Sequence, residues 1–104
     1  MIAVIVGYKL KTGADIQPIF MELRSHAITY HGFVQALNVI TTRDKTIAAI
    51  IYSWEKIEDW HEWENSIIRQ KILNKADNLL LEQPRTTVYR VMPTTAWSYN
   101  ITDD

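Results

Sequence analysis

The chain contains no cysteine among its 104 residues, which excludes disulfide bonds, thiolate metal ligands and cysteine nucleophiles. Glycine is scarce, at three residues, and none belongs to a glycine-rich phosphate-binding loop. The segment HEWEN at 61–65 begins like the zinc motif H-E-x-x-H but ends in Asn65, so the second ligand is missing. We therefore expect neither a metal nor another cofactor.

The chain also lacks an excess of charge of one sign, because its formal net charge is −1 and its basic residues are scattered. We therefore expect neither nucleic acid nor an acidic membrane as its partner. No apolar run approaches the roughly 20 residues that cross a bilayer. The opening MIAVIVGYKLK lacks the basic start and cleavage site of a signal peptide. These absences predict a cytoplasmic protein, and the length predicts one domain.

Apolar periodicity predicts the order strand, helix, strand, strand, helix, strand. One helix is expected from about residue 16 to 29, and a second from 55 to about 76, which Asn65-Ser66 can restart. β-branched and apolar runs predict strands at 2–9, 33–40, 46–54 and 85–92. This order is the ferredoxin-like βαββαβ plan, an α+β fold with a four-stranded antiparallel sheet carrying both helices on one face.

Three of the four tryptophans lie within SWEKIEDWHEW, at Trp54, Trp60 and Trp63. On the second helix the apolar side chains fall within an arc of about 140°, formed by Ile57, Trp60, Trp63, Ile67 and Ile68. A strand-end tryptophan and the helix that follows it can face one another across the space between sheet and helices. We expect these tryptophans to fill core or to wall a pocket for a small aromatic ligand.

Three further residues could complete such a pocket. Asn38 is an amide in an apolar strand, so it must find a partner or a ligand. Tyr8 places a phenol at the end of the first strand, and His26 borders the apolar face of the first helix. Two of them also have a structural interpretation, since Asn38 can face a loop or water and histidines such as His26 are usually edge or surface residues.

The predicted strands are apolar on both faces, whereas a sheet with one solvated side alternates apolar and polar residues. The third strand has Ala48, Ile50 and Tyr52 on one parity and Ile47, Ala49 and Ile51 on the other. On the second strand, Phe33, Leu37 and Val39 share one parity. Two helices cover only one face, so the pattern predicts a homodimer that packs sheet against sheet.

A tail of residues 93–104 follows the predicted domain of residues 1–92. In it Trp97, Tyr99 and Ile101 alternate with polar residues, which is typical of a half-buried strand. The tail could pair with the sheet edge of the partner subunit. Alternatively, it could fold onto its own subunit or fray.

The layout over residues 2–92 resembles the antibiotic biosynthesis monooxygenase family. The resemblance is carried by Trp54 at a strand end, by Trp60 and Trp63 on the acidic helix that follows, and by HGF, ENSIIRQKIL and EQPRTTVYRV. It implies a dimeric α/β barrel. It also implies oxygen chemistry without a cofactor on an aromatic polyketide or quinol, with the substrate itself activating oxygen as an enolate or phenolate. Asn, Trp and Tyr side chains would orient that substrate.

The chain departs from the family at identifiable positions. Ile50 stands where the oxygenases carry Asn, four residues before the strand-end tryptophan. Haem-degrading members need a histidine and a strand-one asparagine where this chain has Leu73 and Gly7-Tyr8, so haem degradation is not expected.

Two hypotheses remain. The first is a cofactor-independent monooxygenase that acts on a small aromatic, quinol or polyketide-like substrate. The three tryptophans would form the walls of its pocket, and Asn38, Tyr8 or His26 would polarise the substrate. The second is a non-catalytic dimeric module that binds a small ligand or serves in a stress response.

Overall fold

Four antiparallel strands form one sheet in the order β2-β3-β1-β4. Their bounds are β1 Ile2–Lys9, β2 Phe33–Ile40, β3 Ile47–Trp54 and β4 Arg85–Arg90. The computed structural model describes residues 1–93, and the predicted tail strand with Trp97, Tyr99 and Ile101 lies outside the described residues. The strand order and the helices between the strands are those of the ferredoxin-like plan, so the predicted fold class is confirmed.

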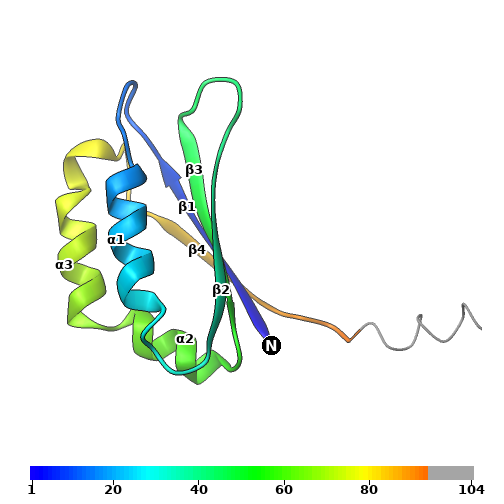
Figure 1. Ribbon diagram of the computed structural model, residues 1–104. Helices are drawn as coiled ribbons and strands as arrows, with labels where there is room; N and C mark the ends of the chain where they lie inside the picture. The colour runs from blue at the N-terminus through cyan, green and yellow to red at the C-terminus, as the bar shows by residue number, and fades with distance from the viewer. Residues whose placement is uncertain (94–104) are drawn as a thin grey trace, which may run out of the picture.

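The helices all lie on one face of this sheet (Figure 1). They are α1 Gln17–Ala27, α2 Ile57–Glu64, α3 Ile67–Lys75 and the short 3₁₀ turn η1 Asp77–Leu79. Pro18 is tolerated in α1 because it occupies the first turn, where its missing N–H has no helical partner. Asp15 lies just before the helix and accepts a hydrogen bond from the backbone N–H of Gln17 at 3.0 Å. Within residues 1–93, no helix is long and apolar enough to cross a bilayer.

The predicted second helix is divided in two at Ser66. The Ser66 hydroxyl accepts a hydrogen bond from the backbone N–H of Arg69 at 3.1 Å, as an N-cap residue does. The expectation that Ile67 and Ile68 continue the apolar face of the tryptophans is wrong, since they are 74% and 39% exposed. The restart resets the helical phase, so α3 buries Arg69 and Ile72 instead.

The core fills the space between the sheet and the helices. Every second residue of β1 and β3 points into it, in the order that a pleated strand dictates. Its largest fully buried side chains are Trp54, Trp60, Trp63, Tyr8, Tyr52 and Phe20. Aromatic rings therefore supply the largest buried side chains of this core, and aliphatic residues fill the space around them.

A bulge at the start of β2 changes the face on which one predicted residue lies. The register shifts between Phe33 and Gln35, so Phe33 pairs with Trp54 and packs edge-on against its ring at 5.5 Å between centroids. The expectation that Phe33 shares a face with Leu37 and Val39 is therefore wrong. A bulge places an extra residue in one strand and moves the preceding side chain to the other side.

Gly32 makes the turn into β2 and has a backbone φ of +82°, in the left-handed region that favours glycine. A Cβ on Gly32 would collide with the carboxylate of Asp59, which lies directly against it. Asp59 is nearly buried and accepts a hydrogen bond from Nδ1 of His31 at 2.9 Å. The turn therefore depends on the absence of a side chain at this position.

Among residues 1–93, no helix lies on the second face of the sheet (Figure 1). Apolar side chains predominate on it, although Gln35, Ser53 and Thr87 share this face. Several of the apolar side chains are well exposed, with Leu37 at 53% and Tyr89 at 49%. Ile5 and Ile51 lie opposite one another at its centre and are half-buried. The prediction that both faces of the sheet are apolar is thus confirmed.

Candidate functional site

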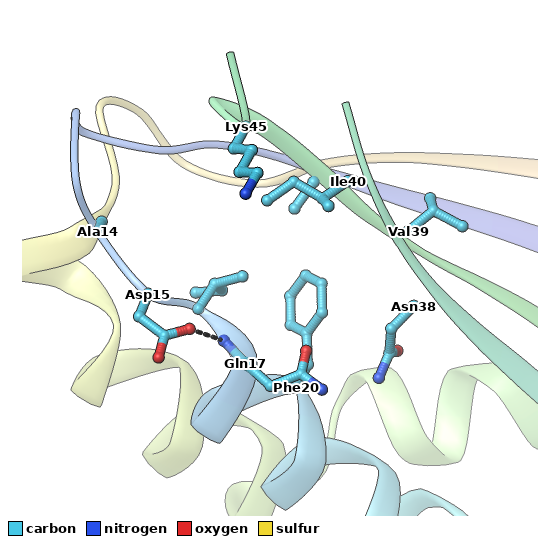
Figure 2. A pocket seen from close by; sticks show the side chains of 10 residues that line it. Ala14, Asp15, Gln17, Phe20, Asn38, Val39, Ile40 and Lys45 are labelled. Atoms are coloured by element: carbon cyan, nitrogen blue, oxygen red, sulfur yellow. Dashed lines mark hydrogen bonds between the residues drawn. The ribbon is translucent and has the colours of Figure 1, made fainter. Parts of the chain in front are cut away.

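A pocket opens where the start of α1 approaches β2 and the hairpin between β2 and β3. Its volume is about 210 Å³, enough for a single-ring molecule rather than a fused polycycle. Phe20 of α1 forms its base, and apolar side chains that include Ile16, Ile40 and Ala48 line it. We call this cavity, shown in Figure 2, the Asn38 pocket.

Asn38 points from β2 toward Phe20 and the helix (Figure 2). Its Oδ1 is buried and has no hydrogen-bond partner within residues 1–93. No hydrogen bond within residues 1–93 ties its Nδ2 atom either, and that atom is not among the buried unpaired ones, so it keeps some contact with solvent. Rotation of the amide group exchanges the two atoms, so Asn38 can offer a ligand either an acceptor or a donor.

Two charged residues flank the pocket. Lys45 has a φ of +57°, the only positive φ of a non-glycine residue within residues 1–93. Its ammonium group extends over the pocket, and the Asp15 carboxylate stands across from it at the start of α1 (Figure 2). A strained backbone at a pocket rim is a common feature of functional sites. This arrangement gives an apolar, ring-sized space a cation, an anion and an untied amide.

Tyr8 lies behind this pocket rather than in it. Its ring packs against Phe20 at 5.0 Å between centroids, and only 1% of the residue is exposed. Burial raises the pKa of the Tyr8 hydroxyl far above its ordinary value, with a further increase from Tyr52 and a smaller opposing effect of Arg69. Tyr8 therefore stays a neutral phenol at physiological pH, and it contacts the pocket-lining Phe20 rather than the pocket.

The three predicted tryptophans lie together in the core, and each is 0% exposed. Trp54 and Trp60 both contact Tyr52, with ring centroids 6.0 and 5.5 Å away, and each other at 6.3 Å. None of four pockets found within residues 1–93 is lined by any of them. In this subunit the tryptophans themselves fill the space between β3 and α2.

The indole N–H groups of Trp63 and Trp54 differ in whether they have a hydrogen-bond partner. Trp63 donates to the Tyr52 hydroxyl at 3.3 Å. The Nε1 atom of Trp54 is buried without a partner within residues 1–93. An unpaired buried N–H is costly, so Trp54 holds an unused donor at the end of β3.

His26 is not brought together with Asn38. It is half-buried on the last turn of α1, whereas the pocket takes residues from the first turn. At 1.5 Å per residue, the nine positions from Gln17 to His26 span roughly 14 Å. Of the six predicted site residues, only Asn38 lines the pocket directly, and its role in binding remains a prediction.

Phe20 and Lys45 line the pocket but were not singled out from the sequence. Phe20 appears there as an ordinary apolar position of a helix, and Lys45 as part of a polar turn. No local pattern indicates that these two segments meet. Within residues 1–93, no group of three or more His, Asp or Glu side chains is arranged to hold a metal ion.

No protein-family model and no curated protein sequence matches the chain. Solved structures share its fold. An antibiotic biosynthesis monooxygenase superposes with a TM-score of 0.78 at 13% identity, over 89% of this chain and 100% of the other. SnoaB, a cofactor-independent oxygenase from Streptomyces nogalater, gives 0.78 at 10% identity, over 89% and 94%. NE2512 from Nitrosomonas europaea, of unknown function, gives 0.76 at 13% identity, over 89% and 90%.

The chain therefore has the ferredoxin-like α+β fold found in antibiotic biosynthesis monooxygenases, and the predicted resemblance is confirmed in the fold. Its neighbours by structure include a cofactor-independent oxygenase and a protein without a known function. With identities of 10 to 13%, this similarity establishes the fold and leaves the reaction to be argued from the site.

Proposed function

We propose that this protein is a homodimeric, cofactor-independent monooxygenase that acts on a small phenol or quinol bound in the Asn38 pocket. The observation that carries the proposal is the untied Asn38 amide in an apolar, ring-sized pocket beneath the ammonium group of Lys45. A phenolic O–H can donate to the Asn38 carbonyl oxygen while the ring packs on Phe20. Pockets of this type use apolar walls for affinity and a few polar groups for orientation.

The proposed role of Lys45 is to promote deprotonation of the bound substrate. A positive charge next to a bound phenol lowers the pKa of that phenol and favours the phenolate. A phenolate is electron-rich enough to reduce O₂ directly. For a quinol the balanced reaction is quinol plus O₂ to hydroxyquinone plus water. One oxygen atom enters the ring, the other leaves as water, and the substrate supplies all the electrons.

A second candidate function is binding of the same class of molecule without turnover. Two observations favour it: the tryptophans close the space between β3 and α2, and Ile50 stands where the oxygenases of the resembling family carry Asn. In this case the Asn38 pocket holds a small aromatic ligand, and the protein serves as a binding or stress-related module.

The homodimer is proposed from the helix-free face of the sheet. Leu37, Val39, Ile47 and Tyr89 are each between 44% and 53% exposed there. A continuous apolar face on a sheet is normally covered. A second copy packed sheet to sheet covers it with no further element, and this closes an α/β barrel. The tail would then reach the partner's sheet edge, a proposal that rests on the alternation of Trp97, Tyr99 and Ile101 alone.

The test combines binding and turnover with hydroquinone as the probe. Calorimetry under argon measures affinity, and an oxygen electrode measures O₂ consumption. Asn38→Leu removes the amide at nearly constant volume and should weaken binding about 10-fold. Lys45→Met should lower the rate of O₂ consumption more than the affinity. Asn78→Leu, an exposed change on η1, serves as the matched control and should alter neither.

The outcomes separate the two candidates. Binding that depends on Asn38, together with O₂ consumption that depends on Lys45, supports the monooxygenase. Binding that depends on Asn38 without O₂ consumption supports the binding module. Equal behaviour of Asn38→Leu and Asn78→Leu in both assays would overturn the assignment of this pocket.

A further inference from the structure

A second cavity lies at the opposite edge of the sheet from the Asn38 pocket, between α3 and the start of β4. Its volume is about 260 Å³. Most of its lining is polar and includes Arg69, Gln70 and Asn74 of α3, with Gln83 and Thr86 on the other side. We call this cavity the Arg69 cleft. The proposed oxygenase chemistry makes no use of it.

Arg69 is the unusual residue of this cleft, because it carries a charge and is only 9% exposed. It is one of two polar or charged residues in the buried set of residues 1–93. Its guanidinium group lies over the ring of Trp60, 5.5 Å from the centroid, a favourable cation–π distance. The Ser66 cap, which accepts from the backbone of Arg69, fixes its position on the first turn of α3.

The guanidinium group has little else to bind within residues 1–93. None of the ion pairs found there involves Arg69. Its single side-chain hydrogen bond runs from Nη1 to the carbonyl oxygen of Glu64 and is long, at 3.4 Å. Arginine cannot lose its proton, and a buried charge without a counter-ion is destabilising. The remaining nitrogens are not among the buried unpaired atoms, and Arg69 is one of the residues that line the cleft.

The surroundings of Arg69 fit an anion of limited size. Behind it lie the phenols of Tyr8 and Tyr52, and the positive charge opposes the increase in their pKa values that burial causes. In front of it lie amides and a hydroxyl, which can bind carboxylate oxygens. One carboxylate, that of Asp77, also lines the cleft and would repel an anion.

We propose that the Arg69 cleft binds a small carboxylate, held by the two-pronged guanidinium group of Arg69 and by the amides of Gln83 and Asn74. Carboxylates match the planar geometry of arginine and accept two parallel hydrogen bonds from it. The occupant neutralises the one buried cation that residues 1–93 leave without a counter-ion. Asp77 on the same cleft favours small, singly charged ligands over multiply charged ones.

The test follows the Nε–Hε resonances of the arginines in ¹⁵N-labelled full-length protein during titration with acetate and, separately, with inorganic phosphate. Acetate should shift the Arg69 signal in a saturable manner, whereas those of exposed Arg24 and Arg43 should move only linearly with salt. The side-chain amide resonances of Gln83 and Asn74, which line the same cleft, report binding in variants that lack Arg69. By this readout Arg69→Gln should weaken acetate binding about 10- to 100-fold, and Arg69→Lys should lose most of it as well. Asp77→Asn should tighten binding in a protein that keeps its buried arginine.

Three results would overturn the proposal. The first is an Arg69 signal that does not saturate with acetate, the second is tighter binding of phosphate than of acetate, and the third is an Asp77→Asn variant that binds acetate no better than the natural chain. If Arg69→Gln fails to fold, the Asp77→Asn variant and the comparison of acetate with phosphate still test the proposal. Asn38→Leu should leave acetate binding unchanged, so this proposal and the proposed function can fail independently.

Discussion

The indole N–H of Trp63 donates a hydrogen bond to the hydroxyl of Tyr52 at 3.3 Å, inside the core. This bond links α2 to β3, two elements that are consecutive in the chain and face each other across the core. Because both groups are buried, the loss of either partner leaves the other unsatisfied.

Tyr52→Phe should therefore destabilise the protein by about 1–3 kcal/mol, the cost of leaving a buried donor unpaired. Tyr8→Phe is the matched control, because Tyr8 is equally buried but takes part in none of the side-chain hydrogen bonds found within residues 1–93. It should change the free energy of unfolding by less than about 1 kcal/mol. Urea denaturation measures both. Equal losses in the two variants would show that the Trp63 bond is not the cause.

Alkaline pH should unfold the protein through the same two tyrosines. Burial raises the pKa of Tyr52, and raises that of Tyr8 further, above the ordinary value of about 10. The unfolded chain releases these protons near pH 10, whereas the folded chain holds them. Their contribution to stability is complete below about pH 10 and is lost as the pH rises above it.

The free energy of unfolding should accordingly fall above about pH 10, and the fall should be shallower in Tyr8→Phe. Denaturation at a series of alkaline pH values measures the slope, and absorbance at 295 nm follows tyrosine ionisation. If all the tyrosines ionise before the fold is lost, the burial argument fails.

Gly32 and Gly13 provide a matched pair of left-handed glycines, with φ values of +82° and +80°. Gly13→Ala meets no atom within 4 Å, so it should cost only the backbone strain of about 1–2 kcal/mol. Gly32→Ala also drives a methyl group into Asp59, which adds about 1–3 kcal/mol of overpacking.

In thermal denaturation, the melting temperature of Gly32→Ala should therefore be well below that of Gly13→Ala. The double variant Gly32→Ala/Asp59→Ala should recover part of the loss, because residues in contact are not additive. Identical melting temperatures for the two single variants would refute the contact with Asp59.

The helix-free sheet face predicts how the proposed dimer can be broken. Leu37→Asp places a charge on that face, where Leu37 is 53% exposed in the single subunit. It should shift the protein to monomers without unfolding them. Ile67→Asp is the control, because Ile67 is 74% exposed on α3, on the other side of the sheet.

Sedimentation velocity at micromolar concentration distinguishes the two variants. The natural chain and Ile67→Asp should sediment as dimers, and Leu37→Asp as a monomer with native circular dichroism. A natural chain that remains a monomer would remove the basis for the barrel.

The sequence by itself determined the order of the elements and the apolar character of both sheet faces. These properties are local: strand and helix periods repeat every two and 3.6 residues and can be read without a partner. The restart at Ser66 was also visible, because a hydroxyl cap favours a few residue types.

Only the tertiary structure decided which residues surround a cavity. From the sequence, Trp60 and Trp63 were equally suited to line a pocket or to fill the core. In the structure both are buried in the core, where Tyr52 and Trp54 pack against Trp60. Phe33 changed face through a bulge that alternation does not reveal. Ile68 lost its place in the core to Arg69 after the helix restarted.

The Asn38 pocket was the least predictable feature. Asn38 stood out as an amide in an apolar strand, but Phe20 and Lys45 gave no local sign of joining it. They meet because the first turn of α1 packs next to β2 and next to the hairpin that joins β2 to β3. Sequence periodicity fixes the face on which a side chain lies, whereas the volumes and registers of packed elements fix which distant side chains it meets.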